Sequence, residues 1–158
     1  MSKHLHFSVG VGGLVVNDAG QVLLVRLNYS QSKDKWMFPG GYVDEREMLQ
    51  QAVIREVKEE AGIEADPLGV VGVRHRLDET RNVYVVFLMR YVSGSPTADG
   101  IEVSDARFWD VCQIQESDEI VGLVQAITAG LNRGALSEPF RELHVPDRSG
   151  EDWALFGW

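Results

Sequence analysis

The sequence contains one cysteine, five prolines and no long apolar run. Cys112 alone cannot form a disulfide within the chain, and such scarcity of cysteine favours a reducing compartment. No stretch approaches the roughly 20 apolar residues that a membrane-spanning helix needs. Gly10, Gly12 and Gly13 interrupt the first apolar segment, so we expect no signal peptide. These absences predict a cytoplasmic protein that has no membrane partner.

Three common catalytic motifs are also missing. The four histidines do not stand at zinc-binding spacing with Cys112. The chain has no Gly-Lys-Ser or Gly-Lys-Thr, which argues against a P-loop. No serine stands in a nucleophile elbow. The sequence therefore disfavours zinc enzymes, P-loop nucleotide hydrolases and serine hydrolases.

The charge is strongly unbalanced, with 24 acidic and 15 basic residues and a net charge of −9. Binding to a nucleic-acid polymer depends on Lys and Arg side chains that neutralise its phosphates. The acidic balance therefore disfavours such a polymer as partner. Most of the acids keep the surface solvated, so the informative ones are those that the spacing brings together.

The 158 residues fit a single domain, 1–158, at the usual size of about 100–200 residues. Apolar segments separated by turn residues predict strands at 7–16, 21–27, 68–76, 83–92 and 106–110. Longer periodic segments predict helices at 44–61 and 118–131. The tail at 137–158 has low periodicity, and it either docks as a strand or contributes to an interface. Strands interleaved with two helices predict an α/β fold in which helices cover the faces of a mixed sheet.

The first expected helix has recognisable ends. Asp44 is a candidate N-cap, and Glu47 follows it at the spacing of a capping box. Gly62 is a natural residue just beyond the last turn. We therefore expect the helix to begin at Asp44 and to end at Ala61.

Three glutamates lie near the end of this helix. Glu56, Glu59 and Glu60 stand at positions i, i+3 and i+4, which places them within one arc of roughly 100°. Like charges repel at this spacing, and the helix macrodipole disfavours anions at the C-terminus. A divalent cation resolves this conflict, because Mg²⁺ prefers oxygen ligands and is usually held by one or two carboxylates and substrate phosphates. Spacing alone also fits an ordinary solvated helix face.

The residues around these glutamates decide between the two interpretations. The fixed positions, in chain order, are Gly41, Glu47, Arg55, Glu56, Val57, Glu59, Glu60, Gly62 and Ile63, and Pro39-Gly40 precede them. This pattern at 41–63 resembles the complete signature of the Nudix hydrolase family. The resemblance implies a Nudix fold, which is a mixed β-sheet sandwiched between helices (α/β/α). It also implies metal-dependent hydrolysis of a diphosphate linkage in a nucleoside diphosphate joined to another moiety.

The resemblance further implies roles for individual residues. Glu56, Glu59 and Glu60 correspond to the ligands of Mg²⁺, for which Mn²⁺ can substitute, and the carbonyl of Gly40 is a possible further ligand. Arg55 corresponds to a residue that holds a glutamate in place, with Glu47 as its partner. These residues, together with Glu102, form the expected catalytic set. The general base is either a helix glutamate such as Glu56, or Glu102 in the segment before the last strand.

Four arginines are candidate substrate contacts, because an anionic substrate needs basic groups nearby: Arg26, Arg74, Arg76 and Arg81. Three aromatic residues could stack on a base. They are Trp36, Phe38 and Tyr84, although we expect Phe38 to pack in the core.

The leaving group stays open. Motifs that mark particular Nudix subtypes are absent, so a nucleotide sugar and a nucleoside triphosphate are both admissible substrates. Two non-hydrolytic alternatives also remain. One is a regulatory Nudix module that binds a nucleotide without cleaving it, and the other is an interaction domain that uses the aromatic tail. The resemblance also implies a homodimer.

Overall fold

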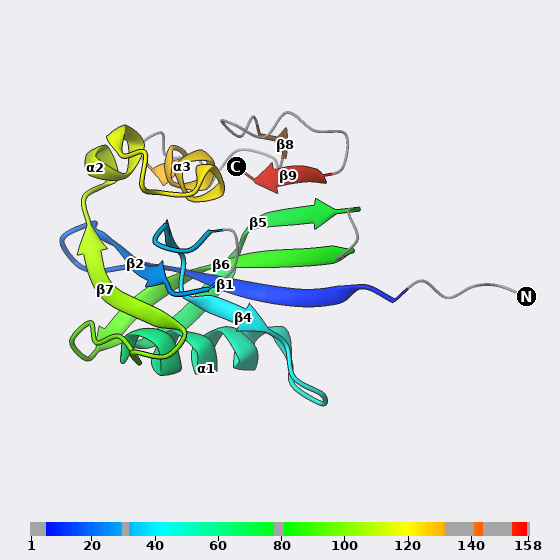
Figure 1. Ribbon diagram of the computed structural model, residues 1–158, viewed down its shortest axis with the longest axis horizontal. Helices are drawn as coiled ribbons and strands as arrows, with labels where there is room; N and C mark the ends of the chain where they lie inside the picture. The colour runs from blue at the N-terminus through cyan, green and yellow to red at the C-terminus, as the bar shows by residue number, and fades with distance from the viewer. Residues whose placement is uncertain (1–5, 30–31, 78–80, 132–140, 144–152, 158) are drawn as a thin grey trace, which may run out of the picture.

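The computed structural model describes residues 6–29, 32–77, 81–131, 141–143 and 153–157 (Figure 1). Its strands are β1 (Ser8–Val16), β2 (Val22–Leu27), β3 (Trp36–Met37), β4 (Gly40–Tyr42), β5 (Glu64–Arg76), β6 (Asn82–Ser93), β7 (Val103–Trp109), β8 (Arg141–Glu142) and β9 (Trp153–Gly157). Its helices are α1 (Leu49–Ala61), α2 (Val111–Glu116) and α3 (Gly122–Thr128).

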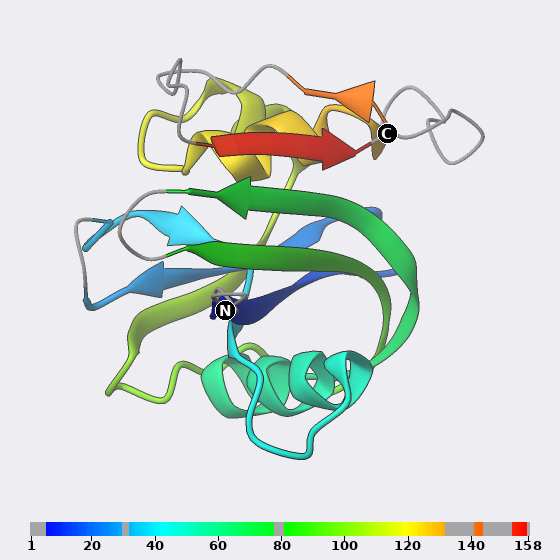
Figure 2. The same ribbon diagram turned by 90° about the vertical axis from the view of Figure 1, so that its right-hand side faces the viewer.

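The strands form one mixed sheet in the order β3-β2-β1-β6-β5-β9-β8. Strand β4 also pairs with β1, and β7 pairs with β2. The β1–β6 pair is parallel, whereas the other pairs of strands are antiparallel. Helix α1 lies on one side of the sheet, with α2 and α3 on the other (Figure 2). The prediction of a mixed sheet sandwiched between helices is therefore confirmed.

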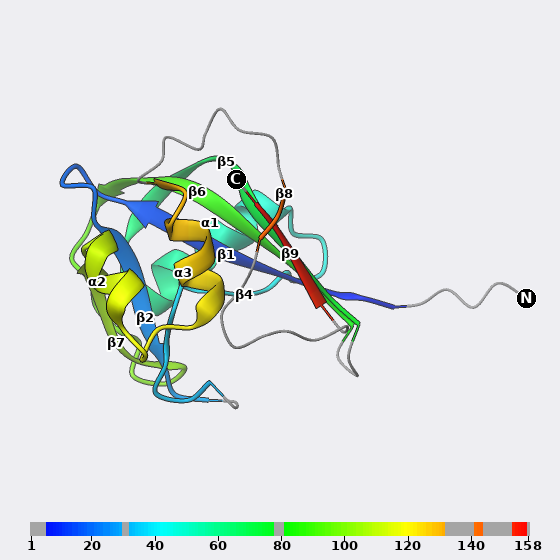
Figure 3. The same cartoon turned by 90° about the horizontal axis from the view of Figure 1, so that it is seen from above.

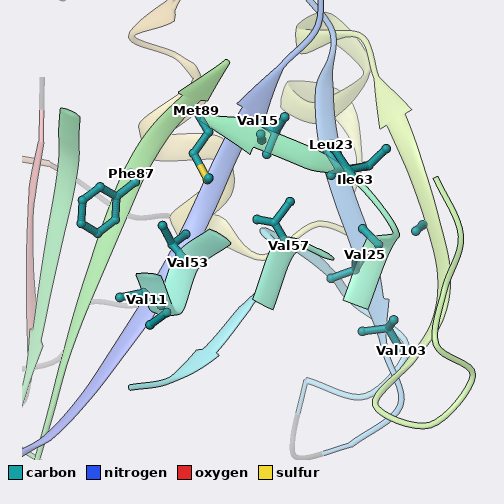
Figure 4. Close-up of a cluster of buried hydrophobic side chains, with 14 of the residues drawn as sticks. Val11, Val15, Leu23, Val25, Val53, Val57, Ile63, Phe87, Met89 and Val103 are labelled. Atoms are coloured by element: carbon teal, nitrogen blue, oxygen red, sulfur yellow. The ribbon is translucent and has the colours of Figure 1, made fainter. Parts of the chain in front are cut away.

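Each face of the sheet carries its own buried cluster. Helix α1 contributes Val53 and Val57 to the first cluster, where they meet side chains from β1, β2 and β6 (Figure 4). The second cluster lies under α2 and α3 and includes Trp36 and Phe38, both almost fully buried. The expectation that Phe38 packs in the core is confirmed. Removing this much apolar surface from water is the main force that holds the helices on the sheet.

Helix α1 begins later than the sequence predicts. Its first residue is Leu49 rather than Asp44, and Met48 is the capping residue. Arg46 has a φ of 66°, a left-handed conformation that a right-handed helix cannot include. The Glu47 carboxylate does accept a hydrogen bond from the amide of Asp44 (3.1 Å). Asp44 and Glu47 therefore close a turn ahead of the helix, so the predicted start was wrong. The predicted end at Ala61 is confirmed, and Gly62 follows in the left-handed conformation.

The second expected helix is also shorter than predicted. Within 118–131 the helix formed is α3, which begins at Gly122 and ends at Thr128, and α2 precedes this range in a segment where the sequence predicted no helix. The carbonyl of Glu119 accepts a hydrogen bond from Trp36 (2.8 Å), and the amide of Val121 donates one to the Trp36 carbonyl (3.1 Å). These backbone groups bond to β3, so they cannot form the first turn of a helix. The two short helices lie side by side, with α2 beside β2 and β7 (Figure 3), whereas Ile127 of α3 packs against Gly72 of β5.

The tail partly joins the sheet. Strand β9 pairs with β5, and β8 pairs with β9, so the expectation that the tail docks as a strand is confirmed for these segments. The remaining residues of 137–158 lie outside the described parts of the chain. In the described residues, no helix is both long and apolar enough to cross a membrane.

Candidate active site

Glu60 lies beneath the short strand β4. Its side chain is almost fully buried, with 2% of the residue exposed. The amide of Gly40 donates a hydrogen bond of 2.8 Å to Glu60 Oε2. The other oxygen, Oε1, is buried and has no hydrogen-bond partner among the described residues. A buried carboxylate oxygen without a partner is costly, so this end of α1 is arranged for something other than stability.

Glu56 lies one turn earlier and is also buried. Its carboxylate fits beneath Gly41, where an added Cβ would come within 2.5 Å of Glu56 Oε1. Glu59 differs from both, because 60% of its side chain is exposed. Of the three glutamates expected on one arc, Glu56 and Glu60 are therefore buried, whereas Glu59 is exposed to solvent.

Arg55 links the glutamates to the turn before the helix. Its Nε and Nη2 each donate a hydrogen bond of 2.9 Å to Glu47, one to each oxygen. Its Nη1 donates to Glu56 Oε1 (2.7 Å) and to Glu59 Oε2 (3.2 Å). The expected contact between Arg55 and Glu47 is therefore confirmed. The hydrogen bonds from Arg55 lower the pKa of Glu47 to about 2, so this carboxylate stays charged and holds the guanidinium in place.

The carboxylates of the site act on one another. Burial, together with the charges of Glu56, Glu102 and Asp99, raises the pKa of Glu60 to about 8 despite the opposing hydrogen bond from Gly40. Burial also raises the pKa of Glu56, although Arg55 opposes this shift. The effect of Glu102 on both residues means that the loop before β7 brings its carboxylate near the end of α1. The sequence predicted this proximity only through the family resemblance.

A divalent cation fits this arrangement. An oxygen-seeking ion would satisfy the free Oε1 of Glu60 and would offset the repulsion between the buried carboxylates. Within the described residues, no three acidic, histidine or cysteine side chains converge closely enough to enclose a metal on their own. Such an enclosure is not required, since Mg²⁺ normally retains waters and binds substrate oxygens besides one or two carboxylates.

A pocket of about 240 Å³ opens beside Gly40 and Gly41. Arg74 and Arg76 line it, whereas Arg26 and Arg81 are not among its lining residues. The other lining residues that matter for a ligand are Tyr29, Ser32, Tyr42, Asn82 and Tyr84. The structure therefore brings two of the four candidate arginines to the same cavity as the glycines that cover Glu56 and Glu60.

Arg74 is held in a defined orientation. Its Nη2 hydrogen-bonds to Oδ1 of Asn82, and its guanidinium lies 4.9 Å from the centre of the Tyr84 ring. The Asn82 amide in turn donates to the Ser8 hydroxyl (3.1 Å). Such fixed orientation reduces the entropy that a binding residue loses when a ligand arrives.

Two candidate arginines lie elsewhere. Arg26 donates a hydrogen bond of 3.2 Å to the carbonyl of Asp34. Arg81 is exposed and has a φ of 40° just before β6. Their assignment as substrate contacts remains a prediction.

Tyr29 is a pocket residue that the sequence did not indicate. Burial raises its pKa to about 12, and the charges of Glu60, Glu102 and Glu56 contribute to the shift. Tyr29 therefore lines the pocket within range of the charges of these acids. A single tyrosine in a polar loop carries no pattern that would have marked it in advance.

Comparison with known proteins agrees with this geometry. The NUDIX domain family model matches residues 6–125. The match covers strands β1 to β7 of the mixed sheet, α1 and the buried glutamates beneath Gly40 and Gly41. The chain belongs to the Nudix hydrolase family. Members of this family generally depend on a divalent metal.

Individual relatives cover different shares of the chain. Nudix hydrolase 8 of Arabidopsis thaliana is 29% identical over 119 residues, which are 72% of this chain and 32% of that protein. An ADP-ribose pyrophosphatase of Methanocaldococcus jannaschii is 30% identical over 111 residues, 68% of this chain and 64% of that protein. The chain thus spans less than two thirds of the length of both relatives.

Solved structures share the fold. The crystal structure of a MutT protein from Methanosarcina mazei superposes with a TM-score of 0.70 at 25% identity. The superposition covers 86% of this chain and all of that one. The similarity therefore extends well beyond the signature at 41–63.

Proposed function

We propose that this protein hydrolyses a diphosphate linkage in a nucleoside diphosphate joined to another moiety, in a reaction that depends on Mg²⁺ or Mn²⁺. The observation that carries the proposal is the buried pair Glu56 and Glu60, whose charges lie close together while one oxygen of Glu60 has no hydrogen-bond partner among the described residues. This pair lies under the glycines that line the pocket. Buried acids in this state are suited to a cation and a polyanionic substrate.

Glu56, Glu59 and Glu60 would hold the metal, together with the carbonyl of Gly40. When bound, the metal neutralises phosphate oxygens and lowers the pKa of a coordinated water. Arg55 keeps Glu56 and Glu59 in position through its bonds to both, and Glu47 orients Arg55. Arg55 and Glu47 thus support the reaction through the glutamates.

A carboxylate must accept the proton of the attacking water. Glu56 and Glu102 are the two candidates. Glu56 already accepts a hydrogen bond from Arg55, which favours its charged form and its role as a ligand. Glu102 is exposed at the loop before β7, yet its charge acts on Glu56 and Glu60. These observations favour Glu102 as the base.

Arg74 and Arg76 would contact the substrate in the pocket beside the diphosphate. Both guanidinium groups belong to β5, and both line the cavity with Gly40 and Gly41. The aromatic rings of Tyr29 and Tyr42 line the same cavity, and they offer stacking surfaces for a base. A nucleotide sugar and a nucleoside triphosphate both fit this description. Arg26 and Arg81 remain weaker candidates for the same role.

The test is a substrate panel. The wild-type protein and Glu60→Gln are incubated with nucleotide sugars, nucleoside triphosphates and dinucleoside polyphosphates, and with Mg²⁺, Mn²⁺ or a chelator. We expect release of a nucleoside monophosphate or phosphate that requires the metal. The variant should turn over at least about 100-fold more slowly, at the scale of lost electrostatic and metal contributions. An unchanged rate in Glu60→Gln would refute the assignment of this site.

The alternative is a regulatory Nudix module that binds a nucleotide without turnover. Tight nucleotide binding by calorimetry, with no product from any member of the panel under either metal, would support that alternative. The buried acids argue against it, because binding a nucleotide alone does not need an acidic pair beneath the pocket.

Three further proposals concern partners and location. The net charge of −9 favours a small substrate over a nucleic-acid polymer. A homodimer is proposed from the family resemblance and is tested by sedimentation equilibrium. A cytoplasmic location is proposed from the single cysteine, which is exposed and free, and cell fractionation tests it.

A further inference from the structure

The loop that carries Glu102 connects β6 to β7 and is anchored to the rest of the site at two points. The amide of Thr97 donates a hydrogen bond to the carbonyl of Ala61, the last residue of α1 (2.9 Å). The amide of Asn28 donates one to the carbonyl of Glu102 (2.9 Å). The next residue, Tyr29, lines the pocket. The loop is therefore bonded to the helix that carries the acidic pair and to the pocket wall.

Between these anchors, one side chain holds the turn. Asp99 Oδ1 accepts hydrogen bonds from three consecutive backbone amides: Ile101 (2.8 Å), Glu102 (3.0 Å) and Val103 (3.0 Å). Gly100 supplies the positive φ of 74° that lets the chain turn back over the carboxylate. Hydrogen bonds to an ionised acceptor are the strong kind. Asp99 thus defines the main-chain path at Glu102 and at the first residue of β7.

The Glu102 side chain is exposed at this turn and acts electrostatically on Glu56, Glu60 and Tyr29. An exposed glutamate on an unsupported loop would sample many orientations, because long polar side chains keep most of their rotamer freedom in water. Fixing the backbone at Glu102 narrows the region that its side chain can reach.

We propose that Asp99 is a positioning residue of the hydrolytic site: its carboxylate holds the turn that presents Glu102 to Glu56 and Glu60. This inference rests on the proposed function and adds to it a residue outside the signature at 41–63. Asp99 is not a catalytic residue, since the role proposed for it is to hold the three backbone amides of the turn. Its contribution should resemble that of other residues that orient a functional side chain, whose loss typically costs about 10–100-fold.

The test compares Asp99→Ala with Asp99→Asn, using the best substrate of the wild-type panel. Asparagine keeps an Oδ1 acceptor, so Asp99→Asn should retain activity within about threefold of wild type, whereas Asp99→Ala should lose about tenfold or more in kcat with little change in KM. In a Glu102→Gln background, Asp99→Ala should cause no further loss. The matched control is Asp18→Ala, which removes an exposed turn acid from the β1–β2 hairpin.

A second readout does not depend on turnover. Hydrogen exchange of the metal-free proteins should show faster exchange at the amides of residues 101–103 in Asp99→Ala than in wild type, Asp99→Asn and Asp18→Ala. The thermal melting temperature should stay within a few degrees of wild type, since the bonds lie in a surface loop.

Several results would overturn the inference. An Asp99→Ala variant that keeps the wild-type kcat would do so. So would an Asp99→Ala substitution that lowers kcat by the same factor in the wild type and in the Glu102→Gln background. An Asp99→Asn variant as damaged as Asp99→Ala would show that the charge matters and not the turn. These results would leave the proposed function intact. A wild-type protein that turns over no substrate would instead refute the proposed function itself.

Discussion

The amide of Gly40 donates a hydrogen bond to Glu60 Oε2 across 20 positions of sequence, while the second oxygen of the same carboxylate stays buried and without a hydrogen-bond partner in the described structure. Gly40 of β4 therefore holds one oxygen of the buried Glu60 carboxylate, and the other oxygen stays available to a ligand. An acid held in this way destabilises the folded protein when charged, unless a cation binds.

Glu60→Gln should weaken metal binding without lowering the stability of the metal-free protein. Without metal, the variant should melt at the same temperature as wild type or higher, because a neutral amide is less costly to bury than a carboxylate. Added Mg²⁺ should raise the melting temperature of the wild type and should raise that of the variant much less. Differential scanning calorimetry with and without Mg²⁺ measures both. Glu116→Gln, an exposed acid at the end of α2, is the matched control.

The pH dependence of stability follows from the same residue. Since burial raises the pKa of Glu60 from 4.5 to about 8, the folded protein keeps a proton that the unfolded chain releases near pH 4.5. The stability of the metal-free protein should therefore fall as the pH rises from about 4.5 to about 8, and level off above that. Urea titrations at several pH values measure the slope. Comparable slopes in wild type and Glu60→Gln would contradict this assignment.

Arg55 should not tolerate replacement by lysine. Its planar guanidinium bonds to both oxygens of Glu47 and also to Glu56, a geometry that a single ammonium cannot reproduce. We expect Arg55→Lys to lose about 10–100-fold in kcat. Steady-state kinetics measure this loss. Arg90→Lys is the control, because Arg90 forms an exposed pair with Asp66 on the far part of the sheet.

The Arg55–Glu47 ion pair also predicts how the stability of the folded protein changes in acid. Arg55 lowers the pKa of Glu47 to about 2. The stabilising effect of the Arg55–Glu47 ion pair should be fully present above about pH 4.5 and should disappear as the pH falls towards 2. The melting temperatures of wild type and Arg55→Ala should therefore converge in strong acid. A constant difference across this range would mean that Glu47 does not carry the effect.

Gly41→Ala should disturb Glu56 without unfolding the domain. An added Cβ would come within 2.5 Å of Glu56 Oε1, and the end of a side chain can move aside. We expect about tenfold weaker Mg²⁺ binding, at the scale of other changes that misorient a ligand. Calorimetric titration of the metal measures it. Gly69→Ala is the control, because nothing lies within 4 Å of its added Cβ.

Arg76→Ala should weaken substrate binding more than turnover. Arg76 lines the pocket from β5. Loss of a basic group that binds substrate and transition state equally raises KM and leaves kcat nearly unchanged. Steady-state kinetics should show this split, and a fall in kcat alone would assign Arg76 to the reaction itself.

Local patterns in the sequence determined much of this protein. The i, i+3, i+4 spacing placed Glu56, Glu59 and Glu60 on one helix, and the family signature paired Arg55 with Glu47. Apolar segments separated by turn residues indicated the strands, and the periodicity of 118–131 indicated a helix, part of which forms as α3. These properties depend on neighbours within a few residues of the chain, so a linear sequence displays them directly.

Tertiary structure alone decided the rest. It determined that Glu56 and Glu60 are buried while Glu59 is exposed, because burial depends on β4 crossing over the end of α1. It began α1 at Leu49, because Arg46 has a left-handed backbone conformation. It delayed the start of the second predicted helix to Gly122, because the backbone of Glu119 and Val121 bonds to Trp36. It also gathered Tyr29, Arg74 and Arg76 around one pocket. These features depend on contacts between segments that are far apart in the sequence. The free energy of such contacts cannot be deduced from the pattern of neighbouring residues.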